Sequence, residues 1–222
     1  MSRTLFIHIP RTGGTSIQQA GIAVNTRNAG LKKDIQKQME MDPRSPQSVS
    51  PHVASMVQKH IPYSFLDREF LNRYDRVFSI VRNPWARLVS LYNHKDSVPV
   101  EGTWQRYRST ISWEDYLNRM DEFIMTPSYY WAHPYDQWGT QSDWVDIRKV
   151  NILRYENLQE DLNSYFNKSI DLPLVNQSKV VDYRTYYTDE QIEKVAKWYK
   201  LDIAQWGFNF DTGATKNYWS LA

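Results

Sequence analysis

The chain has 222 residues, of which 41% are hydrophobic and 23% charged, and its formal net charge is +2. These values are typical of a globular chain and give no general field for a polyanion, so we expect a single domain over residues 1–222 and no nucleic-acid partner. Cysteine is absent, which excludes disulfides, cysteine metal sites and a cysteine nucleophile.

The first stretch, residues 4–24, predicts a strand, a turn and a helix. TLFIHI is apolar and β-branched, and Pro10 follows it. Ile17, Ala20 and Val24 then recur at helical spacing. The turn between them is suited to phosphate binding, because glycines allow close backbone approach and N–H groups converge where a helix begins. The candidate ligands for a phosphate group are Arg11, Thr12, Gly13, Gly14, Thr15 and Ser16.

Two common nucleotide motifs are absent from this turn. It lacks the G-x-x-x-x-G-K-[ST] pattern of a Walker A loop and the G-x-G-x-x-G dinucleotide pattern. Taken alone, it is also compatible with a tight turn that carries an exposed arginine.

The next segment is polar and predicts helix over Leu31–Met41 followed by loop. Ser64 is a candidate N-cap for the helix FLDREFLNRY, with Asp67 at the capping-box position. His60 then lies on the loop that enters this helix, and His52 has a weaker context. Either histidine could also be a surface or packing residue.

A second strand–turn–helix unit follows at RVFSIV, Arg76–Val81. Asn83 is a candidate N-cap and Pro84 a candidate first helical residue. Arg82 therefore lies at the carboxyl end of a strand, where ligands bind in open α/β sheets. Ser90 lies nearly two turns into the helix and could form a hydrogen bond to an anion held by Arg82. The alternative is that Arg82 forms a surface ion pair and that Ser90 packs within the helix.

The rest of the chain predicts further helices and one strand. We expect loop over Val98–Arg108, a helix over residues 113–125 capped by Ser112, and a strand over Val150–Arg154. A helix with apolar residues at 158, 162 and 165 follows that strand. The last helix begins at Thr188 with a capping-box pattern, presents one apolar stripe to Trp206, and ends at Gly207.

Two motifs carry a family resemblance. HIPRTGGTSI resembles the 5′-phosphosulfate loop of sulfotransferases, and VRNPWARLVSLY resembles their 3′-phosphate motif, an arginine with a serine eight positions later. The closest group includes the heparan and chondroitin uronyl 2-O-sulfotransferases and bacterial relatives. The resemblance extends over nearly the whole chain and is strongest at residues 5–18 and 78–92.

The resemblance implies a fold and a reaction. The fold would be α/β and P-loop-like, as in nucleotide kinases, with a mainly parallel central sheet in three α/β/α layers. The activity would be sulfuryl transfer from 3′-phosphoadenosine 5′-phosphosulfate (PAPS) to a hydroxyl, which leaves 3′-phosphoadenosine 5′-phosphate (PAP). Arg82 and Ser90 would bind the 3′-phosphate, and His60 fits the place of the general base. Arg11 replaces the family's usual lysine and would act as an electrostatic clamp rather than as a proton donor.

The resemblance also suggests acceptor and cofactor residues. Arg184 and Lys179 lie in a region that closes over the nucleotide in the family, although each could be an exposed cation. The acceptor, a carbohydrate by this resemblance, would contact an aromatic-rich segment, and His133 there is the second candidate for the base. The candidate acceptor residues are Tyr130, Trp131, His133, Trp138 and Gln141. Aromatic residues that fix a long loop to the core are an equally good interpretation.

Two other functions stay open from the sequence. One is a P-loop-type phosphotransferase, although no P-loop lysine is present. The other is a non-catalytic nucleotide- or glycan-binding module, for which the Arg11 replacement is the best support. No residue cluster has metal-ligand spacing, so we expect no metal. No signal peptide or membrane-length apolar run occurs, and we expect a cytoplasmic protein of bacterial or viral origin.

Overall fold

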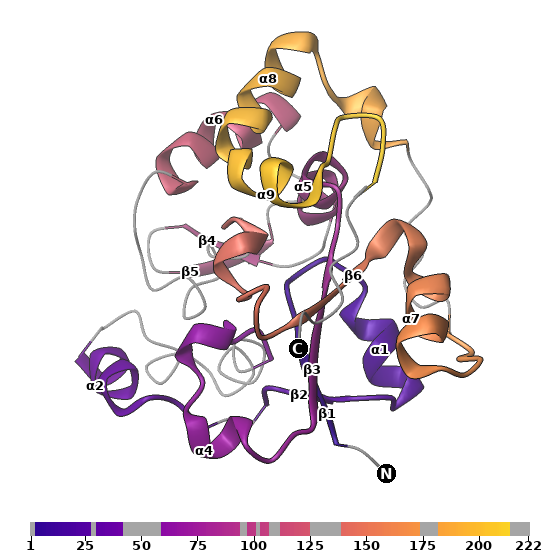
Figure 1. The fold of residues 1–222 in the computed structure, drawn as a ribbon. Helices are drawn as coiled ribbons and strands as arrows, with labels where there is room; N and C mark the ends of the chain where they lie inside the picture. Colours follow the sequence, from indigo (N-terminus) through magenta and orange to yellow (C-terminus); the bar gives the residue numbers. More distant parts are fainter. Residues whose placement is uncertain are drawn as a thin grey trace.

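The computed structural model describes residues 3–27, 30–41, 59–93, 97–100, 103–106, 112–124, 139–173 and 182–213. Its centre is a parallel sheet in the strand order β2-β1-β3-β6 (Figure 1). The strands are β1 (Thr4–Ile7), β2 (Val24–Asn25), β3 (Arg76–Val81) and β6 (Asn151–Arg154). Phe6 of β1 is paired with Phe78 of β3, and Phe78 is paired with Asn151 of β6. The carboxyl ends of β1 and β3 therefore lie side by side.

Helices cover both faces of this sheet, because successive strand residues point to opposite faces. Phe6, Phe78 and Leu153 pack on one face with α1 (Gly14–Ala20) and α7 (Leu158–Phe166). Leu5, Ile7 and Ile152 belong to the core of the other face. That core includes apolar side chains from α5 (Pro84–Tyr92), α6 (Trp113–Ile124), α8 (Asp189–Trp198) and α9 (Lys200–Trp206). The fold is thus the expected P-loop-like α/β fold in three layers.

The remaining elements lie around this core. They are α2 (Lys33–Met41), α4 (Arg68–Leu71), the antiparallel pair β4 (Ser97–Val100) and β5 (Thr103–Arg106), and the 3-10 helices η2 (Tyr63–Phe65), η5 (Gln141–Asp143), η6 (Tyr155–Asn157) and η7 (Tyr183–Tyr186). Figure 1 shows α6, α8 and α9 gathered around α5, while α1 lies beside α7. In the part of the chain that the structure describes, no helix is long and apolar enough to cross a membrane.

Several predicted helix ends are confirmed. The side chain of Asn83 accepts hydrogen bonds from the backbone of Trp85 and Ala86, with Pro84 in the first turn. Thr188 forms a complete capping box with Gln191. These local signals fixed the boundaries because each residue satisfies N–H groups that a helix start leaves without partners.

Four local predictions were wrong. The first helix ends at Ala20, and Val24 lies in the short strand β2 with its side chain 52% exposed. Ser64 lies inside η2, and Asp67 is the N-cap of α4. Residues 97–100 and 103–106 form two paired strands where we expected loop.

The fourth correction concerns the last helix. It is two helices, α8 and α9, that meet at Tyr199. The apolar stripe continues across this break, because Val195 and Trp206 are both buried in one core. Gly207 ends α9 in a left-handed conformation, as predicted.

Candidate functional site

The loop after β1 has an unusual backbone. Arg11 has a φ of 67° and Gly13 a φ of 92°, both left-handed. Glycine accepts this conformation easily, whereas a left-handed arginine costs roughly 1–2 kcal/mol. The loop therefore needs outside support at Arg11, and two arginines from the second strand–turn–helix unit provide it.

Contacts between the two units join the motifs found in the sequence. The Arg11 guanidinium donates from Nε to Ser90 Oγ at 3.1 Å. Arg82 donates from Nη1 to the backbone carbonyl of Arg11 at 3.2 Å. The structure thus brings together Arg11, Arg82 and Ser90, which are separated by up to 79 positions in the chain.

Arg82 is held in a largely buried position. Its guanidinium carbon lies 4.2 Å from the ring centre of Tyr155, an arrangement favourable for a cation over an aromatic face. Its Nε is buried and has no hydrogen-bond partner among the described residues. Burial lowers the pKa of Arg82, and nearby Tyr155 and Glu156 act in the opposite direction. A half-buried cation whose Nε has no described acceptor is well placed to bind an anion.

Tyr155 also contacts the first loop. A Cβ atom added to Gly13 would lie 3.2 Å from the Tyr155 ring. The ring therefore packs against the loop while it covers Arg82. Tyr155 directly follows β6, so residues that come after three neighbouring strands, β1, β3 and β6, contribute to one site.

The hydroxyl groups of the loop have different surroundings. Thr12 is fully buried and donates its hydroxyl proton to the carbonyl of Ile9 at 2.8 Å. This bond stabilises the turn and uses the proton that we expected to be offered to a phosphate group. Thr15 is exposed and Ser16 is half-buried at the start of α1. Both remain predicted ligands for the anion.

His60 lies next to this loop. Its Nδ1 is 2.9 Å from the carbonyl oxygen of His8. A carbonyl accepts, so Nδ1 carries the proton and Nε2 is the basic nitrogen of the neutral ring. The rings of His60 and Trp144 are nearly perpendicular, with 6.4 Å between their centres. The tautomer is the one that a general base acting through Nε2 requires.

His8 is a site residue that the sequence analysis did not single out. Its ring lies 4.2 Å from that of His60 and is 8% exposed. A Cβ atom added to Gly14 would lie 1.9 Å from His8 Nε2, so only glycine allows this close approach. Burial, followed by the charges of His60, Lys59 and Arg11, holds the pKa of His8 well below 6.5. Its sequence signals were its place near the end of a buried strand and at the first position of the motif HIPRTGGTSI.

Gln141 serves the framework of the site. Its amide donates to the carbonyl of Arg82 at 2.8 Å and accepts from the Arg82 N–H at 2.9 Å. It also donates to buried Asp202 at 3.2 Å. Gln141 is fully buried, and these contacts favour a structural role over the predicted acceptor role.

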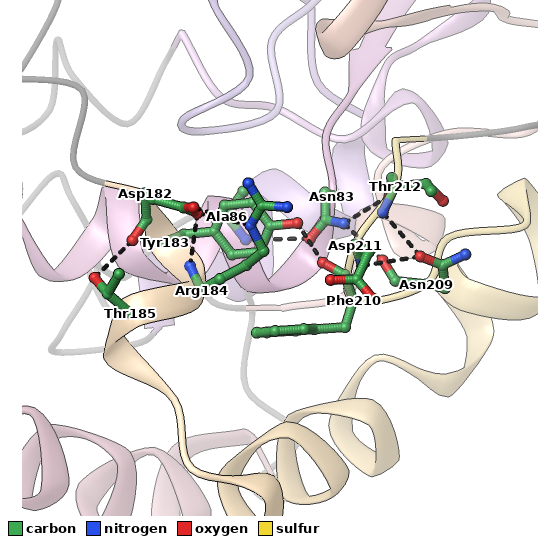
Figure 2. Close-up of polar contacts among 10 residues, drawn as sticks. All are labelled: Asn83, Ala86, Asp182, Tyr183, Arg184, Thr185, Asn209, Phe210, Asp211 and Thr212. Carbon is green, nitrogen blue, oxygen red and sulfur yellow. Dashed lines mark hydrogen bonds and ion pairs between the residues drawn. The ribbon is translucent and has the colours of Figure 1, made fainter.

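Arg184 forms a surface ion pair. Its Nε is 2.9 Å from Asp182, and the two side chains are 50% and 45% exposed. Figure 2 shows this pair at the start of η7, where the neighbouring Tyr183 donates a hydrogen bond to the carbonyl of Phe210, close to the contacts that Asn83 makes with Asn209 and Thr212. The Arg184 guanidinium carbon lies 5.9 Å from the ring centre of Tyr183, and its cofactor role stays a prediction.

The other acceptor candidates, Tyr130, Trp131, His133 and Trp138, lie outside the described residues, as do His52 and Lys179. Among the described residues, no group of three or more His, Asp or Glu side chains could hold a metal ion.

The described residues form one site at the carboxyl edge of the sheet. A parallel sheet carries a glycine-containing turn at its carboxyl edge, with arginines from two loops and a histidine beside it. The profile of the sulfotransferase domain matches residues 5–172. The chain therefore belongs to the sulfotransferase domain family.

Comparisons with individual proteins show only distant similarity. No curated protein matches the chain significantly. Among solved structures, the mouse sulfotransferase SULT7A1 in complex with PAP is 14% identical with a TM-score of 0.37. The match covers 89% of this chain and 62% of the mouse chain, so the chain spans less than two thirds of that relative's length.

Proposed function

We propose that the chain is a sulfotransferase that moves the sulfuryl group of PAPS to a hydroxyl group and releases PAP. The observation that carries this proposal is the contact between the two motifs. Arg11 of the first motif binds Ser90 of the second, and Arg82 of the second binds the backbone of Arg11. One nucleotide with phosphate groups at both its 3′ and 5′ ends would occupy both motifs at once.

The residues present fit this donor. Arg82 and Ser90 would bind the 3′-phosphate, and the buried Nε of Arg82 offers a donor that no described protein atom uses. The first loop, with Gly13, Thr15 and Ser16, would receive the phosphosulfate. Arg11 and Arg82 would attract these anions by their positive charge, while Glu156 lies near Arg82 and Asp202 near the buried Arg87.

Arg11 would stabilise negative charge at the 5′ end of the donor. Its guanidinium stays protonated at any ordinary pH, so it supplies charge and hydrogen bonds rather than a proton. Such preorganised positive charge is a major source of rate enhancement in group transfer.

His60 would act as the general base. Its Nε2 would take the proton of the acceptor hydroxyl as the acceptor oxygen forms a bond to sulfur. The bond from sulfur to the phosphate oxygen breaks, and PAP leaves with the electron pair. This role is supported by the bond from His60 Nδ1 to the His8 carbonyl, which leaves Nε2 as the basic nitrogen.

The acceptor we propose is a carbohydrate, on the strength of the resemblance to uronyl 2-O-sulfotransferases. The aromatic-rich segment with Tyr130, Trp131 and Trp138 would contact it, and His133 is the second candidate for the base. We propose that no metal takes part, because guanidinium and backbone groups supply the positive charge. EDTA should then leave the rate unchanged.

The test is transfer of radioactive sulfate from labelled PAPS to a panel of heparan, chondroitin and bacterial polysaccharides. Wild-type chain should label at least one acceptor, and ATP should not serve as a phosphate donor. His60→Ala should reduce turnover about 10²–10⁴-fold while PAP affinity changes little, because a general base acts on the acceptor.

His60→Ala with full turnover would move the base to His133. PAP binding without transfer to any acceptor would favour a non-catalytic module. Transfer of phosphate from ATP would establish the phosphotransferase reading instead.

A further inference from the structure

Arg87 is a buried cation to which the proposed reaction gives no direct role. It lies on α5 between Arg82 and Ser90 and is 1% exposed. Burial lowers its pKa, while Tyr199 and Asp202 nearby stabilise its charged form. A fully buried charge is costly unless it is paired and hydrogen-bonded, so its contacts need a reason.

The guanidinium of Arg87 connects two loops. Its Nε donates to the carbonyl of Pro10 at 3.0 Å, and its Nη1 donates to the carbonyl of Gly139 at 2.9 Å. Pro10 directly precedes Arg11, whose own carbonyl accepts from Arg82. Two arginines from the second motif thus bind two consecutive carbonyl groups of the first.

These bonds fix the direction of two peptide groups. In a planar trans peptide, the C=O and the following N–H point in opposite directions. Because the carbonyls of Pro10 and Arg11 point to the arginines of the second unit, the N–H groups of Arg11 and Thr12 point away from them. Successive N–H groups beside a left-handed residue can form a concave anion site, and Arg11 has this conformation.

We infer that Arg87 is a positioning residue that holds the loop Pro10–Gly14 in the conformation that binds the 5′ end of the donor. The inference rests on the proposed function for the identity of that ligand. The role of Arg87 is indirect: it touches the loop, and the loop touches the nucleotide. The planar fork matters, since lysine keeps the charge but cannot reproduce two bonds in fixed directions.

The test compares two nucleotides in Arg87→Lys and in wild type. PAP uses both ends of the site, whereas adenosine 3′-phosphate lacks the 5′ group. Calorimetry should show PAP affinity reduced about tenfold to a hundredfold in Arg87→Lys, with the affinity for adenosine 3′-phosphate nearly unchanged. Arg87→Met, which removes the charge, should give the same pattern with at least as large a loss.

A matched control is Val195→Ala, which removes buried volume from α8 and leaves the hydrogen bonds of Arg87 in place. It should lower the melting temperature and leave the ratio of the two affinities unchanged. Equal losses for both nucleotides in Arg87→Lys, or no loss for either, would overturn the inference.

Amide hydrogen exchange in the nucleotide-free chain gives an independent reading. Exchange at residues 11–14 should be about tenfold faster in Arg87→Lys than in wild type or Val195→Ala. Unchanged exchange there would also overturn the inference. If wild type bound neither nucleotide, the proposed function would fail, and this exchange measurement would still decide whether Arg87 holds the loop.

Discussion

The two strand–turn–helix units have the same order of elements but different kinds of turn. The first turn uses Gly13 as a helix cap without a side-chain bond and has a left-handed Arg11. The second uses Asn83, whose side chain binds the backbone of two helical residues, and Pro84 follows it. Helix α5 is almost entirely buried, whereas only Gly14 and Ile17 are buried in α1.

The two turns therefore differ in how they are held in place. The second turn satisfies its helix start within the protein, so it is a rigid base from which side chains extend. The first turn has no side-chain cap, and Arg82 and Arg87 hold it from outside. A ligand-binding loop can thus be left with a strained backbone when a neighbouring unit fixes it.

Among the changes considered, removing the side chain of Arg82 should have the largest effect, because Arg82 joins the second unit to the first turn. Arg82→Ala removes a cation from the proposed 3′-phosphate site and a hydrogen bond to the Arg11 carbonyl. We expect PAP binding to weaken by about 2–4 kcal/mol, the scale for a buried charge-assisted contact. Calorimetric titration with PAP measures this, and an unchanged affinity would remove Arg82 from the site.

In the second unit, we expect Asn83→Ala to lower mainly the free energy of unfolding. The change removes the N-cap of α5 and two bonds, both of 2.8 Å, to the carbonyls of Asn209 and Thr212 (Figure 2). We expect the free energy of unfolding to fall by about 2–3 kcal/mol. Asn83→Ser keeps a capping oxygen and should recover part of this in urea unfolding. Equal losses for both variants would mean that the cap contributes little.

The buried His8 beside the first turn should make stability depend on pH. Its pKa in the folded state lies well below 6.5, so the unfolded chain takes up a proton first as the pH falls. The resulting stability is complete above pH 6.5 and decreases below it, by at most about 1.4 kcal/mol per pH unit. Urea unfolding between pH 7.5 and 5.5 should therefore show a smaller loss in His8→Phe than in wild type. Parallel profiles would contradict this burial of a neutral ring.

Of these residues, Arg184 should contribute least to the stability of the fold. Its ion pair with Asp182 is half-exposed, and such pairs contribute about 0–1 kcal/mol. Arg184→Ala should change the melting temperature only slightly. A large loss of PAP affinity would instead support its predicted cofactor role.

The sequence was sufficient where local chemistry decides the structure. The bounds of β3 match the predicted strand Arg76–Val81, and the caps Asn83 and Thr188 act as predicted. The motif residues Arg11, Arg82 and Ser90 were recognised by resemblance, and their meeting follows from the adjacency of β1 and β3.

The sequence was insufficient to predict those features that depend on a distant contact or on a weak local signal. We expected loop over Val98–Arg108, where two short strands nevertheless pair, and Val24 continued a helical spacing although Gly21 ends the helix. The roles of His8, Arg87 and Gln141 depend on contacts across 50 or more positions, which no local pattern carries.

The most direct test of a single site built from both units is calorimetric titration of wild-type chain with PAP, ADP and adenosine 5′-phosphate. Only PAP carries a phosphate group for each unit. We predict clear preference for PAP over both other nucleotides, by at least about tenfold, since one charge-assisted contact is worth roughly 1.5–3 kcal/mol. Equal binding of the three, or preference for ADP, would contradict a 3′-phosphate site at Arg82 and Ser90.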